Sequence, residues 1–294
     1  MIVCPSCGSS TWTLHYTGPI RNGSFGKEVV ASIQKCSNCS LERLDDKFSL
    51  PKNSYSTSAY RDALEQHIDE DHHFKSHGHL LKYPLEILNH ESFYKKNVLD
   101  LGCASGLFLD AIKGLANLAI GVEPCTLWHD LLKSKNIVPH TSTSEALATH
   151  GSIFDYVVSH QVIEHVDCPQ SFVRDALKLL SPGGRLLLST PNLDDILMHT
   201  LPNDFPSFFY RTQHKWYFNS QSLLALSKTL GANVEKLVYK HRYGFTNYYS
   251  WLNIKKPSGH ISDMPYFDSF DPAWCSFLES TGRADNIFLV LTNQ

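Results

Sequence analysis

One stretch of the sequence restricts the possible folds more than any other. It is Val98–Gly106, an apolar run that ends in an acidic residue and continues through two glycines. An amphipathic helical pattern begins at Leu107, and a second apolar run, Ile120–Val122, ends in Glu123. This order predicts a strand, a tight turn, a helix and a second, parallel strand. In such a unit the ligand lies across the carboxyl ends of the strands, where glycines let the backbone come close.

The spacing within this turn distinguishes two kinds of adenosine ligand. A dinucleotide site has the pattern G-x-G-x-x-G. Here the glycines are Gly102 and Gly106, preceded by Asp100, with Ala104 between them. Asp100 suits a ligand that carries an amino group and a sulfonium rather than phosphates, and Glu123 can accept hydrogen bonds from both hydroxyls of a ribose. The spacing therefore disfavours a nicotinamide dehydrogenase.

These residues resemble the nucleotide-binding signature of class I S-adenosylmethionine-dependent methyltransferases. The family often has a glycine at the position of Ala104, and an alanine is compatible with the turn if its φ is negative. The resemblance implies S-adenosylmethionine as cofactor and a doubly wound, mostly parallel seven-stranded sheet. The cofactor-binding residues that it implies are Asp100, Gly102, Ala104, Gly106, Glu123 and His160.

Strands and helices alternate from residue 97 onward, which predicts a parallel sheet covered on both faces. Beyond the first two strands, the pattern predicts a short strand near 137–138 and longer ones at 153–158, 186–190, 234–239 and 286–292. The expected helices are 125–135, 170–180 and one that runs from Asn219 or Ser220 to Gly231.

Pro182–Gly184 is expected to end the helix at 170–180 and to turn into the next strand. This turn, a last antiparallel strand and Asp155 in the fourth strand resemble the same series in class I methyltransferases. Residues 97–294 are therefore expected to form the methyltransferase domain.

Four of the eight cysteines form two C-x₂-C pairs: Cys4, Cys7, Cys36 and Cys39. In a reducing compartment such pairs are typical of a structural zinc site with four thiolate ligands. β-Forming residues at 11–17 and 27–35 flank a turn-rich segment at 18–23, so residues 1–48 are expected to form a zinc ribbon. A unit this short has little core, and zinc would supply much of its folding free energy. The other four cysteines are expected to be small buried apolar residues.

Residues 49–96 are polar and helical in pattern and are expected to form a linker or a cap over the active site. They include a dense group of histidines: His67, His72, His73, His77 and His79. Two of these could bind a metal from one helical face, but a solvated helix over the active site is the favoured interpretation. An aromatic-rich insertion at about 241–284 is expected either to cover the substrate or to pack on itself.

Further motifs narrow the resemblance. The cysteine pairs, Glu164–Val166 and Thr190–Asn192 are together similar to zinc-ribbon methyltransferases that act on deoxysugars and related small molecules. That resemblance implies a small-molecule acceptor, and the expected target is a hydroxyl of a sugar, nucleotide sugar or glycan.

Removing a proton from such a hydroxyl requires a base with a pKa near neutrality. His165 is one candidate, with Glu164 or Asp167 to orient it or to help bind a cation; alternatively, it begins the next helix and bonds to the backbone. His214 is a second candidate, because sugar C-methyltransferases place a Glu-His pair at this point. Gln213 replaces that glutamate and would stabilise an imidazolium less, which favours O-methylation over carbanion chemistry. Gln213 and His214 are equally compatible with a structural role in their loop.

Charge and composition restrict the partners. The net charge is −3 and no block of lysines or arginines stands out, so nucleic acid is not the expected partner. Neither a signal-peptide pattern nor an apolar run of membrane-spanning length is found, and a cytoplasmic location is expected. Two alternatives come from other classes: a zinc-ribbon RNA methyltransferase, and a non-catalytic protein that uses the fold as a binding surface.

Overall fold

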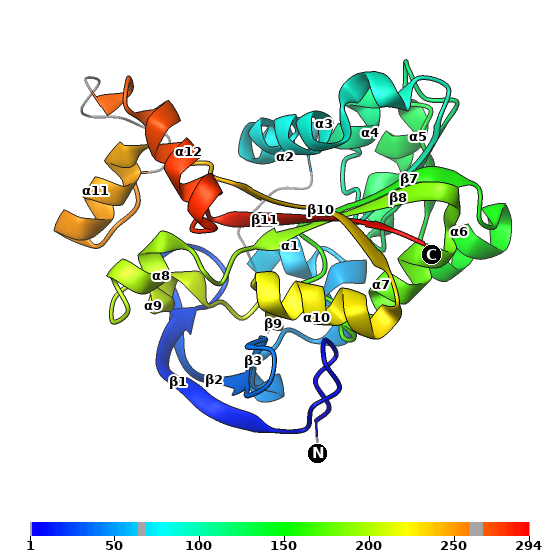
Figure 1. Ribbon diagram of the computed structural model, residues 1–294. Coiled ribbons are helices and arrows are strands. Elements are labelled where there is room, and N and C mark those ends of the chain that lie inside the picture. Colours follow the sequence, from blue (N-terminus) through cyan, green and yellow to red (C-terminus); the bar gives the residue numbers. More distant parts are fainter. Residues whose placement is uncertain (1, 64–68, 259–266, 294) are drawn as a thin grey trace.

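The computed structural model describes residues 2–63, 69–258 and 267–293 (Figure 1). Its central feature is a seven-stranded sheet with the order β10-β11-β8-β7-β4-β5-β6. β11 is antiparallel to both of its neighbours, and the other neighbouring pairs are parallel. The expected doubly wound, mostly parallel α/β fold is confirmed. The strands are β4 (Asn97–Leu101), β5 (Leu118–Val122), β6 (Val138–His140), β7 (Phe154–His160), β8 (Leu180–Pro191), β10 (Asn233–Lys240) and β11 (Asn286–Thr292).

Helices cover both faces of this sheet (Figure 1). Because successive residues of a strand point to opposite faces, β4 contributes Val98 to one core and Leu99 and Leu101 to the other. The first core contains residues of α3 (Lys82–Leu88), α4 (Leu107–Ile112) and α5 (His129–Ser134). The second contains residues of α6 (Thr143–His150), α7 (Pro169–Lys178) and α10 (Ser220–Leu230).

The ends of α10 show how local sequence fixes an element. The Asn219 side chain accepts a hydrogen bond from the backbone N–H of Ser222 at 3.0 Å, which satisfies an N–H that lacks a helical partner. The helix ends at Gly231, which has a φ of 68° and so adopts the left-handed conformation that favours glycine. Both ends agree with the sequence prediction.

The junction between α7 and β8 differs from the prediction. α7 ends at Lys178, and β8 begins at Leu180, before Pro182–Gly184 rather than after it. The pairing of β8 with β7 shifts between Leu180 and Arg185, so the Pro-Gly-Gly segment is an irregularity within the strand. Gly183 has a φ of 77°, which explains why glycine is needed at this shift.

A second, four-stranded sheet has the order β1-β2-β3-β9. Its strands are β1 (Trp12–Arg21), β2 (Glu28–Cys36), β3 (Glu42–Leu44) and β9 (Trp216–Tyr217). The turn expected at 18–23 lies later in the chain, because Pro19 and Ile20 pair with Val30 and Val29 and Ile20 is fully buried. The chain reverses between Asn22 and Lys27, whose backbone groups are joined by a 2.8 Å hydrogen bond.

The part of the chain that connects β3 to β4 forms short helices, including α1 (Ala59–Ala63), α2 (Glu70–His77) and α3. α2 is fixed over the carboxyl end of the large sheet by the Lys135 ammonium, which lies 2.5 Å from the Glu70 carboxylate. His73 on α2 also lies with its Nδ1 atom 2.5 Å from the Ser105 hydroxyl. His67 lies outside the described residues.

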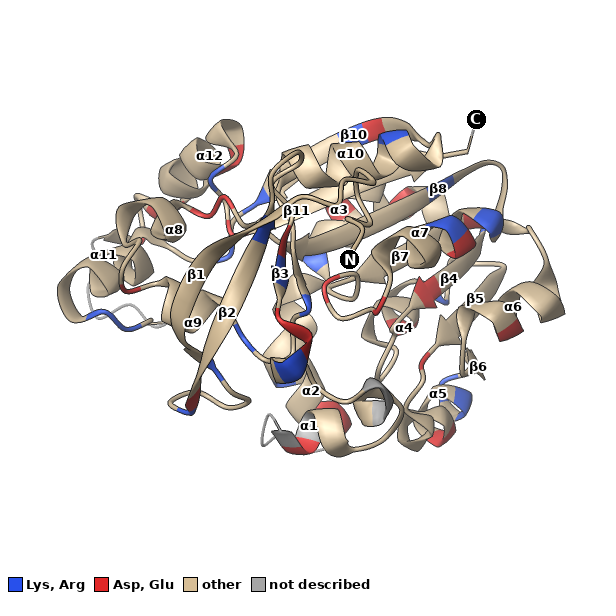
Figure 2. Ribbon diagram, turned by 90° about the horizontal axis from the view of Figure 1, so that it is seen from below, with Lys and Arg blue, Asp and Glu red and all other residues tan. Residues whose placement is uncertain are grey.

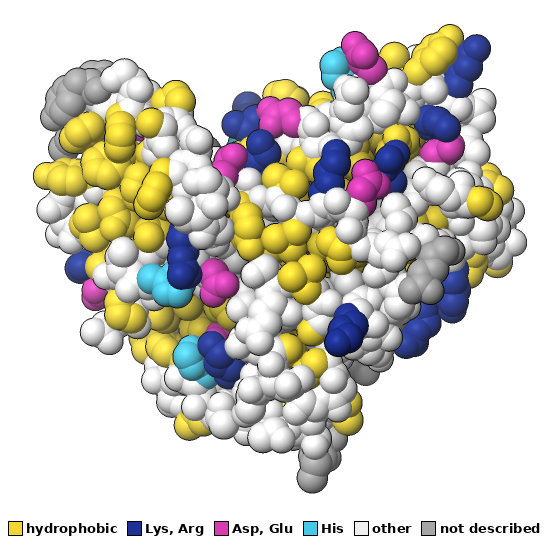
Figure 3. Space-filling view, in the orientation of Figure 1, with side chains coloured by type: hydrophobic (Ala, Val, Ile, Leu, Met, Phe, Trp, Pro, Cys, Tyr) yellow, Lys and Arg dark blue, Asp and Glu magenta, His cyan; other side chains and the backbone are white. Residues whose placement is uncertain are grey.

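The aromatic-rich segment forms α11 (Phe245–Ile254) and α12 (Asp271–Thr281), which lie together at one end of the molecule (Figure 1). Phe245 and Trp274 pack edge to face at 5.3 Å, and Trp251 packs against Phe205 at 4.9 Å. The segment therefore packs on itself and against α9 (Pro206–Phe209), while Trp251 also lines the central cavity. Figure 3 shows apolar side chains gathered over this lobe.

The four scattered cysteines differ in burial. Cys103 and Cys125 are buried, as expected, and Cys275 is half-buried. Cys168 is exposed, so the expectation is wrong there; it immediately precedes Pro169, which begins α7.

Acidic and basic residues are interspersed over the surface elements (Figure 2). Among the described residues, the structure contains no helix that is long and apolar enough to cross a bilayer.

Candidate active site

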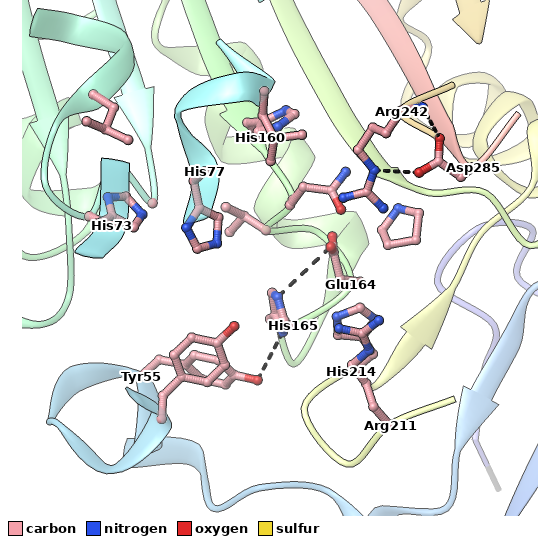
Figure 4. Close-up of a pocket in the computed structure, with 18 of the residues that line it drawn as sticks. Tyr55, His73, His77, His160, Glu164, His165, Arg211, His214, Arg242 and Asp285 are labelled. Atoms are coloured by element: carbon pink, nitrogen blue, oxygen red, sulfur yellow. Dashed lines mark hydrogen bonds and ion pairs between the residues drawn. The ribbon is translucent and has the colours of Figure 1, made fainter. Parts of the chain in front are cut away.

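A cavity of about 1100 Å³ opens at the carboxyl ends of β4, β5 and β7. We distinguish two parts by their residues. The strand-end half contains residues that follow or end these strands: Asp100, Gly102, Ala104, Glu123, Trp128 and His160. The histidine half contains residues from separate segments: Arg21, Tyr55, Glu164, His165, Arg211 and His214. Figure 4 labels all of these except Arg21.

Glu123 is held in a fixed orientation at the tip of β5. Its carboxylate accepts hydrogen bonds from the backbone N–H of Ala104 at 2.9 Å and of Cys125 at 2.8 Å, one on each oxygen. A carboxylate has about four lone-pair sites, so both oxygens retain capacity for hydroxyl groups in the cavity. This geometry fits the two hydroxyls of a ribose.

Ala104 differs from the sequence expectation, because its φ is 46° rather than negative. A non-glycine residue in the left-handed region costs about 1–2 kcal/mol, and the hydrogen bond to Glu123 accompanies this conformation. The glycine that the family often has at this position would adopt the same φ without that cost.

The two glycines of the turn have different surroundings. Gly102 lines the cavity, and a Cβ atom there would lie 2.5 Å from the side chain of Val162. Gly106 does not line it: a Cβ atom there would lie 2.6 Å from Leu132 on α5. Both have a positive φ, so the turn requires glycine at each position, but Gly106 serves the packing of α5 rather than the cavity surface.

Asp100 lies at the strand end beside Glu123 and is only 6% exposed. Burial, and secondarily the negative charge of Glu123, raises the pKa of Asp100 to about 7. A cation bound between the two carboxylates would offset this repulsion. The strand-end half therefore fits a ligand that has both a ribose and a positive charge, as S-adenosylmethionine has.

The other strand-end residues shape this half without adding charge. Burial lowers the pKa of His160 to about 3, so its imidazole is neutral, and its Nδ1 atom lies 2.5 Å from the Ser189 hydroxyl. His73 of α2 lies over the same half, 5.6 Å from Trp128 between ring centroids. The sequence did not predict that His73 and Trp128 line the cavity, because only tertiary packing brings these two residues to it.

His165 is oriented by a backbone carbonyl. Its Nδ1 atom lies 2.8 Å from the carbonyl oxygen of Gln213, which also accepts a 2.7 Å hydrogen bond from the Tyr55 hydroxyl. Because a carbonyl oxygen can only accept, Nδ1 carries the proton and Nε2 is the unprotonated nitrogen of the ring. Nε2 lies 4.0 Å from the Glu164 carboxyl group (Figure 4).

The remaining predicted residues of the histidine half are also brought together. Burial raises the pKa of Glu164 to about 8, so that this carboxyl group is largely protonated at neutral pH. The His214 ring lies 4.7 Å from that of His165, edge to face. Burial, and then the charges of Arg211 and His165, keep the pKa of His214 well below its ordinary value. His214 is thus a neutral neighbour of His165.

The structure also shows the partners of three other residues that the sequence analysis named. The Gln213 side chain does not orient His214, because its amide makes no hydrogen bond to a described residue, and it is the backbone carbonyl that holds His165. Asp167 pairs with Lys215 at 3.1 Å rather than with His165. Asp155 lies in β7, the fourth strand of the large sheet, as expected; it accepts hydrogen bonds from Lys96 and the Asn97 N–H, both at 2.9 Å, at the amino end of the strand and outside the cavity.

A cluster of four thiols lies outside this cavity and consists of Cys4, Cys7, Cys36 and Cys39. All four sulfur atoms lie within 4.8 Å of one another, with Cys4 to Cys39 at 3.5 Å and Cys7 to Cys36 at 3.6 Å. Tetrahedral zinc with Zn–S bonds of about 2.3 Å places sulfur atoms about 3.8 Å apart. The cluster therefore fits a four-thiolate zinc site.

The sequence reasoning missed the basic residues of the cavity. Arg21 comes from the end of β1, Arg211 from the segment before β9, and Arg242 from the segment after β10. Arg242 is paired with the buried Asp285, which raises the pKa of the arginine and lowers that of the carboxyl group (Figure 4). No local pattern marks these arginines as cavity residues.

Comparison with known proteins agrees with this architecture. Residues 74–237, more than half of the chain, match the family model described as a methyltransferase domain. The chain therefore belongs to the methyltransferase domain family, and the nucleotide-binding signature lies within the matched segment.

Curated relatives match over part of their length. A ubiquinone biosynthesis O-methyltransferase of Bartonella tribocorum is 31% identical over 106 residues, which is 34% of this chain and 43% of that protein. The human mitochondrial ubiquinone biosynthesis O-methyltransferase is 26% identical over 169 residues, 52% of this chain and 46% of that protein. The chain thus spans less than half the length of each of these relatives.

Solved structures show the same fold. A SAM-dependent methyltransferase from Thermotoga maritima superposes with a TM-score of 0.51 at 18% identity, covering 76% of this chain and 94% of that one. A complex of the Haloferax volcanii Trm112 methyltransferase activator with a methyltransferase gives 0.52 at 13% identity, covering 75% and 91%.

Proposed function

We propose that this protein transfers the methyl group of S-adenosylmethionine to a hydroxyl of a small-molecule acceptor. One observation carries the proposal: two buried carboxyl groups at neighbouring strand tips share a cavity with an imidazole whose Nδ1 atom is oriented by a backbone carbonyl. Membership of the methyltransferase domain family supports it.

The strand-end half would hold the cofactor, which supplies an electrophilic methyl group on a sulfonium. Glu123 accepts hydrogen bonds from the ribose hydroxyls, and the two backbone N–H groups already bonded to it keep its oxygens in place. Asp100 lies where it can balance positive charge. Gly102 allows close approach, since a side chain there would collide with Val162. His160 contacts the ligand as a neutral ring.

The histidine half would hold the acceptor and remove its proton. Methyl transfer is an in-line displacement, so holding the nucleophile collinear with the reacting bond supplies much of the rate enhancement. His165 is the base, because the unprotonated Nε2 takes the hydroxyl proton while Nδ1 remains bonded to the Gln213 carbonyl oxygen. Glu164 lies 4.0 Å from Nε2, and its carboxyl group would stabilise the resulting imidazolium only in its ionised form.

The acceptor class follows from chemistry and from the relatives. The curated relatives are named O-methyltransferases of ubiquinone biosynthesis, which supports a hydroxyl as the target. The resemblance to zinc-ribbon enzymes favours a hydroxyl of a sugar, nucleotide sugar or glycan within this class.

The test is turnover on a hydroxyl panel. Purified protein is incubated with S-adenosylmethionine and a catechol, a free sugar, a sugar phosphate or a nucleotide sugar, and release of S-adenosylhomocysteine is measured. We expect acceptor-dependent release with one class of hydroxyl compound. Tight cofactor binding without turnover on any of them, combined with methylation of RNA, would contradict the proposal.

We also propose that Cys4, Cys7, Cys36 and Cys39 hold one structural zinc. Two backbone turns bring the pairs into position: Gly8 donates to the Cys4 carbonyl and Ser40 to the Cys36 carbonyl, and both residues have a positive φ. With four thiolate ligands the site is closed to substrate, so zinc would stabilise the hairpin rather than react.

Metal analysis tests the zinc site. Protein purified without added zinc should contain one zinc per chain, and Cys36→Ser should lose it and melt at a lower temperature. Cys168→Ser, which changes an exposed cysteine outside the cluster, is the matched control and should retain the metal. Wild-type protein that is folded and metal-free would refute the assignment.

A further inference from the structure

We infer that the methyl acceptor carries an oxyanion, a phosphate or a carboxylate, which binds to Arg21 and Arg211 in the histidine half of the cavity. The inference rests on the proposed function, because it names the substrate class of the same site. It comes from two guanidinium groups that have no acidic partner among the residues that the structure describes.

The two arginines are fixed side by side by their backbones. The Arg21 N–H donates to the carbonyl oxygen of Tyr210 at 3.0 Å, and the Arg21 carbonyl oxygen accepts from the N–H of Thr212 at 3.0 Å. These bonds form a parallel bridge between Arg21 and Arg211. Both side chains line the cavity, so the tip of the N-terminal hairpin delivers one of them to the site.

Neither guanidinium is neutralised. Within the described part of the chain, no carboxylate lies within 4.0 Å of Arg21 or Arg211, and the Nε atom of each is buried without a hydrogen-bond partner. Glu164 is the acid whose charge interacts with Arg211, and burial favours its protonated form. Burial, followed by the charge of Arg211, lowers the pKa of Arg21 to about 9, so Arg21 remains cationic at neutral pH. Arginine side chains are not deprotonated in proteins, and Arg211 therefore also carries its charge.

A third arginine of the same cavity, Arg242, does have an acidic partner. Arg242 donates to Asp285, which is itself buried. Two desolvated cations that lack such a partner are unfavourable, and groups of this kind concentrate at functional sites where a ligand completes them. An oxyanion ligand would supply the missing charge.

The surroundings specify the rest of the acceptor. The Arg21 guanidinium lies 4.6 Å above the ring of Phe208, which in turn packs against Phe25 at 6.0 Å. An arginine has five donors in a planar fork, which binds phosphate or carboxylate through paired hydrogen bonds. Arg211 lies beside His214 and therefore next to His165 (Figure 4). The anion would be bound close to the hydroxyl that is methylated, with an apolar wall behind it.

Binding of simple oxyanions tests the inference. With S-adenosylhomocysteine at saturation, the protein is titrated with inorganic phosphate, with benzoate and with benzyl alcohol as the neutral match for benzoate. We expect saturable binding of at least one oxyanion and none of benzyl alcohol. Phosphate binding alone indicates a phosphorylated acceptor, and benzoate binding alone indicates a carboxylated one.

Variants separate a binding role from a structural one. Arg21→Gln and Arg211→Gln should each weaken oxyanion binding at least 10-fold while S-adenosylhomocysteine binds as before. Without ligand they should melt no lower than the wild type, because each removes a cation that no carboxylate of the described residues compensates. Arg185→Gln, which breaks an exposed pair with Glu235, is the control and should bind the oxyanion normally.

If a glutamine variant does not fold, Arg211→Lys keeps the charge but loses the paired donors, and should weaken binding several-fold. Two results would overturn the inference: no oxyanion binding by protein that binds S-adenosylhomocysteine, or oxyanion binding that is equal in the wild type and the arginine variants. Failure of S-adenosylhomocysteine itself to bind would instead count against the proposed function.

Discussion

The two halves of the cavity differ in how the chain builds them. The strand-end half comes mainly from two consecutive strand-to-helix connections, and its ionisable groups are the acids Asp100 and Glu123. The histidine half is assembled from separate segments, and its permanent charges are the cations Arg21 and Arg211. The difference in sign matches a cationic methyl donor on one side and an anionic acceptor on the other. It also separates what a family shares, cofactor binding, from what distinguishes its members.

The largest expected effect is on the base of the histidine half. His165→Gln should lower kcat by about 10²–10⁴-fold, because general-base catalysis supplies roughly that factor. The dissociation constant of S-adenosylhomocysteine should not change, since the strand-end half is intact. Turnover on the acceptor found in the hydroxyl panel and calorimetric titration measure the two quantities.

His214→Asn is the matched control, because His214 is a neutral neighbour with a strongly lowered pKa. It should cost much less activity than His165→Gln. Equal losses in the two variants would assign proton removal to the pair rather than to His165, and wild-type turnover by His165→Gln would remove the assignment.

The next effect concerns the ribose carboxylate of the strand-end half. Glu123→Ala should weaken S-adenosylhomocysteine binding by about 1–3 kcal/mol, the contribution typical of a charged hydrogen-bonding group. Calorimetry on the folded variant measures the loss, with the exposed Glu91→Gln as control. Unchanged affinity in Glu123→Ala would show that this carboxylate does not hold the ligand.

The third prediction concerns the pH dependence of S-adenosylmethionine binding, which should follow the ionisation of Asp100 in the strand-end half. The pKa of Asp100 is raised to about 7, so this carboxyl group is mainly protonated below that pH and ionised above it. A cationic ligand is bound better by the ionised form, and the affinity for S-adenosylmethionine should therefore rise with pH through 7. Below pH 7 it should fall by up to about 10-fold per pH unit.

Titration calorimetry between pH 6 and 8 follows this dependence. Asp100→Asn should flatten the profile, whereas Asp175→Asn, on the exposed face of α7, should leave it unchanged. A flat profile in the wild type would place the positive charge of the ligand away from Asp100.

The smallest expected effect is on stability. Ala104→Gly should raise the free energy of unfolding by up to about 1 kcal/mol, because it removes the cost of a positive φ, partly offset by the greater freedom of glycine in the unfolded chain. Ala148→Gly in α6, an exposed helical position, should lower it by roughly 0.5–1 kcal/mol. Urea denaturation compares the two, and a destabilised Ala104→Gly would show that Cβ contacts outweigh backbone strain.

Much of the fold and of the strand-end half follows from the sequence because both depend on local patterns. Apolar runs, the Asp100–Gly106 turn and the Asn219 cap each act within a few residues, and the structure places them as predicted. The conformation of Ala104 was not predictable from this pattern, because its positive φ accompanies a hydrogen bond to Glu123 on the next strand.

The histidine half was predicted where residues follow a recognisable strand end, as Glu164 and His165 do, and where a motif resembles a family pattern, as at His214. The partners of Gln213 and Asp167 did not follow from the sequence, which left alternatives open for both, because a residue's partner is set by packing between distant segments. Arg21 could not be assigned from sequence at all. Its place in the cavity depends on the length of β1 and on backbone pairing with the segment that precedes β9.

The central claim is that one nucleoside sulfonium occupies the strand-end half. Calorimetric titration of folded, zinc-loaded protein with S-adenosylmethionine, its demethylated product and a nicotinamide dinucleotide tests it most directly. We predict one saturable site per chain for the first two compounds and no heat of binding for the third. Absence of saturable binding for both sulfur-containing nucleosides would contradict the account.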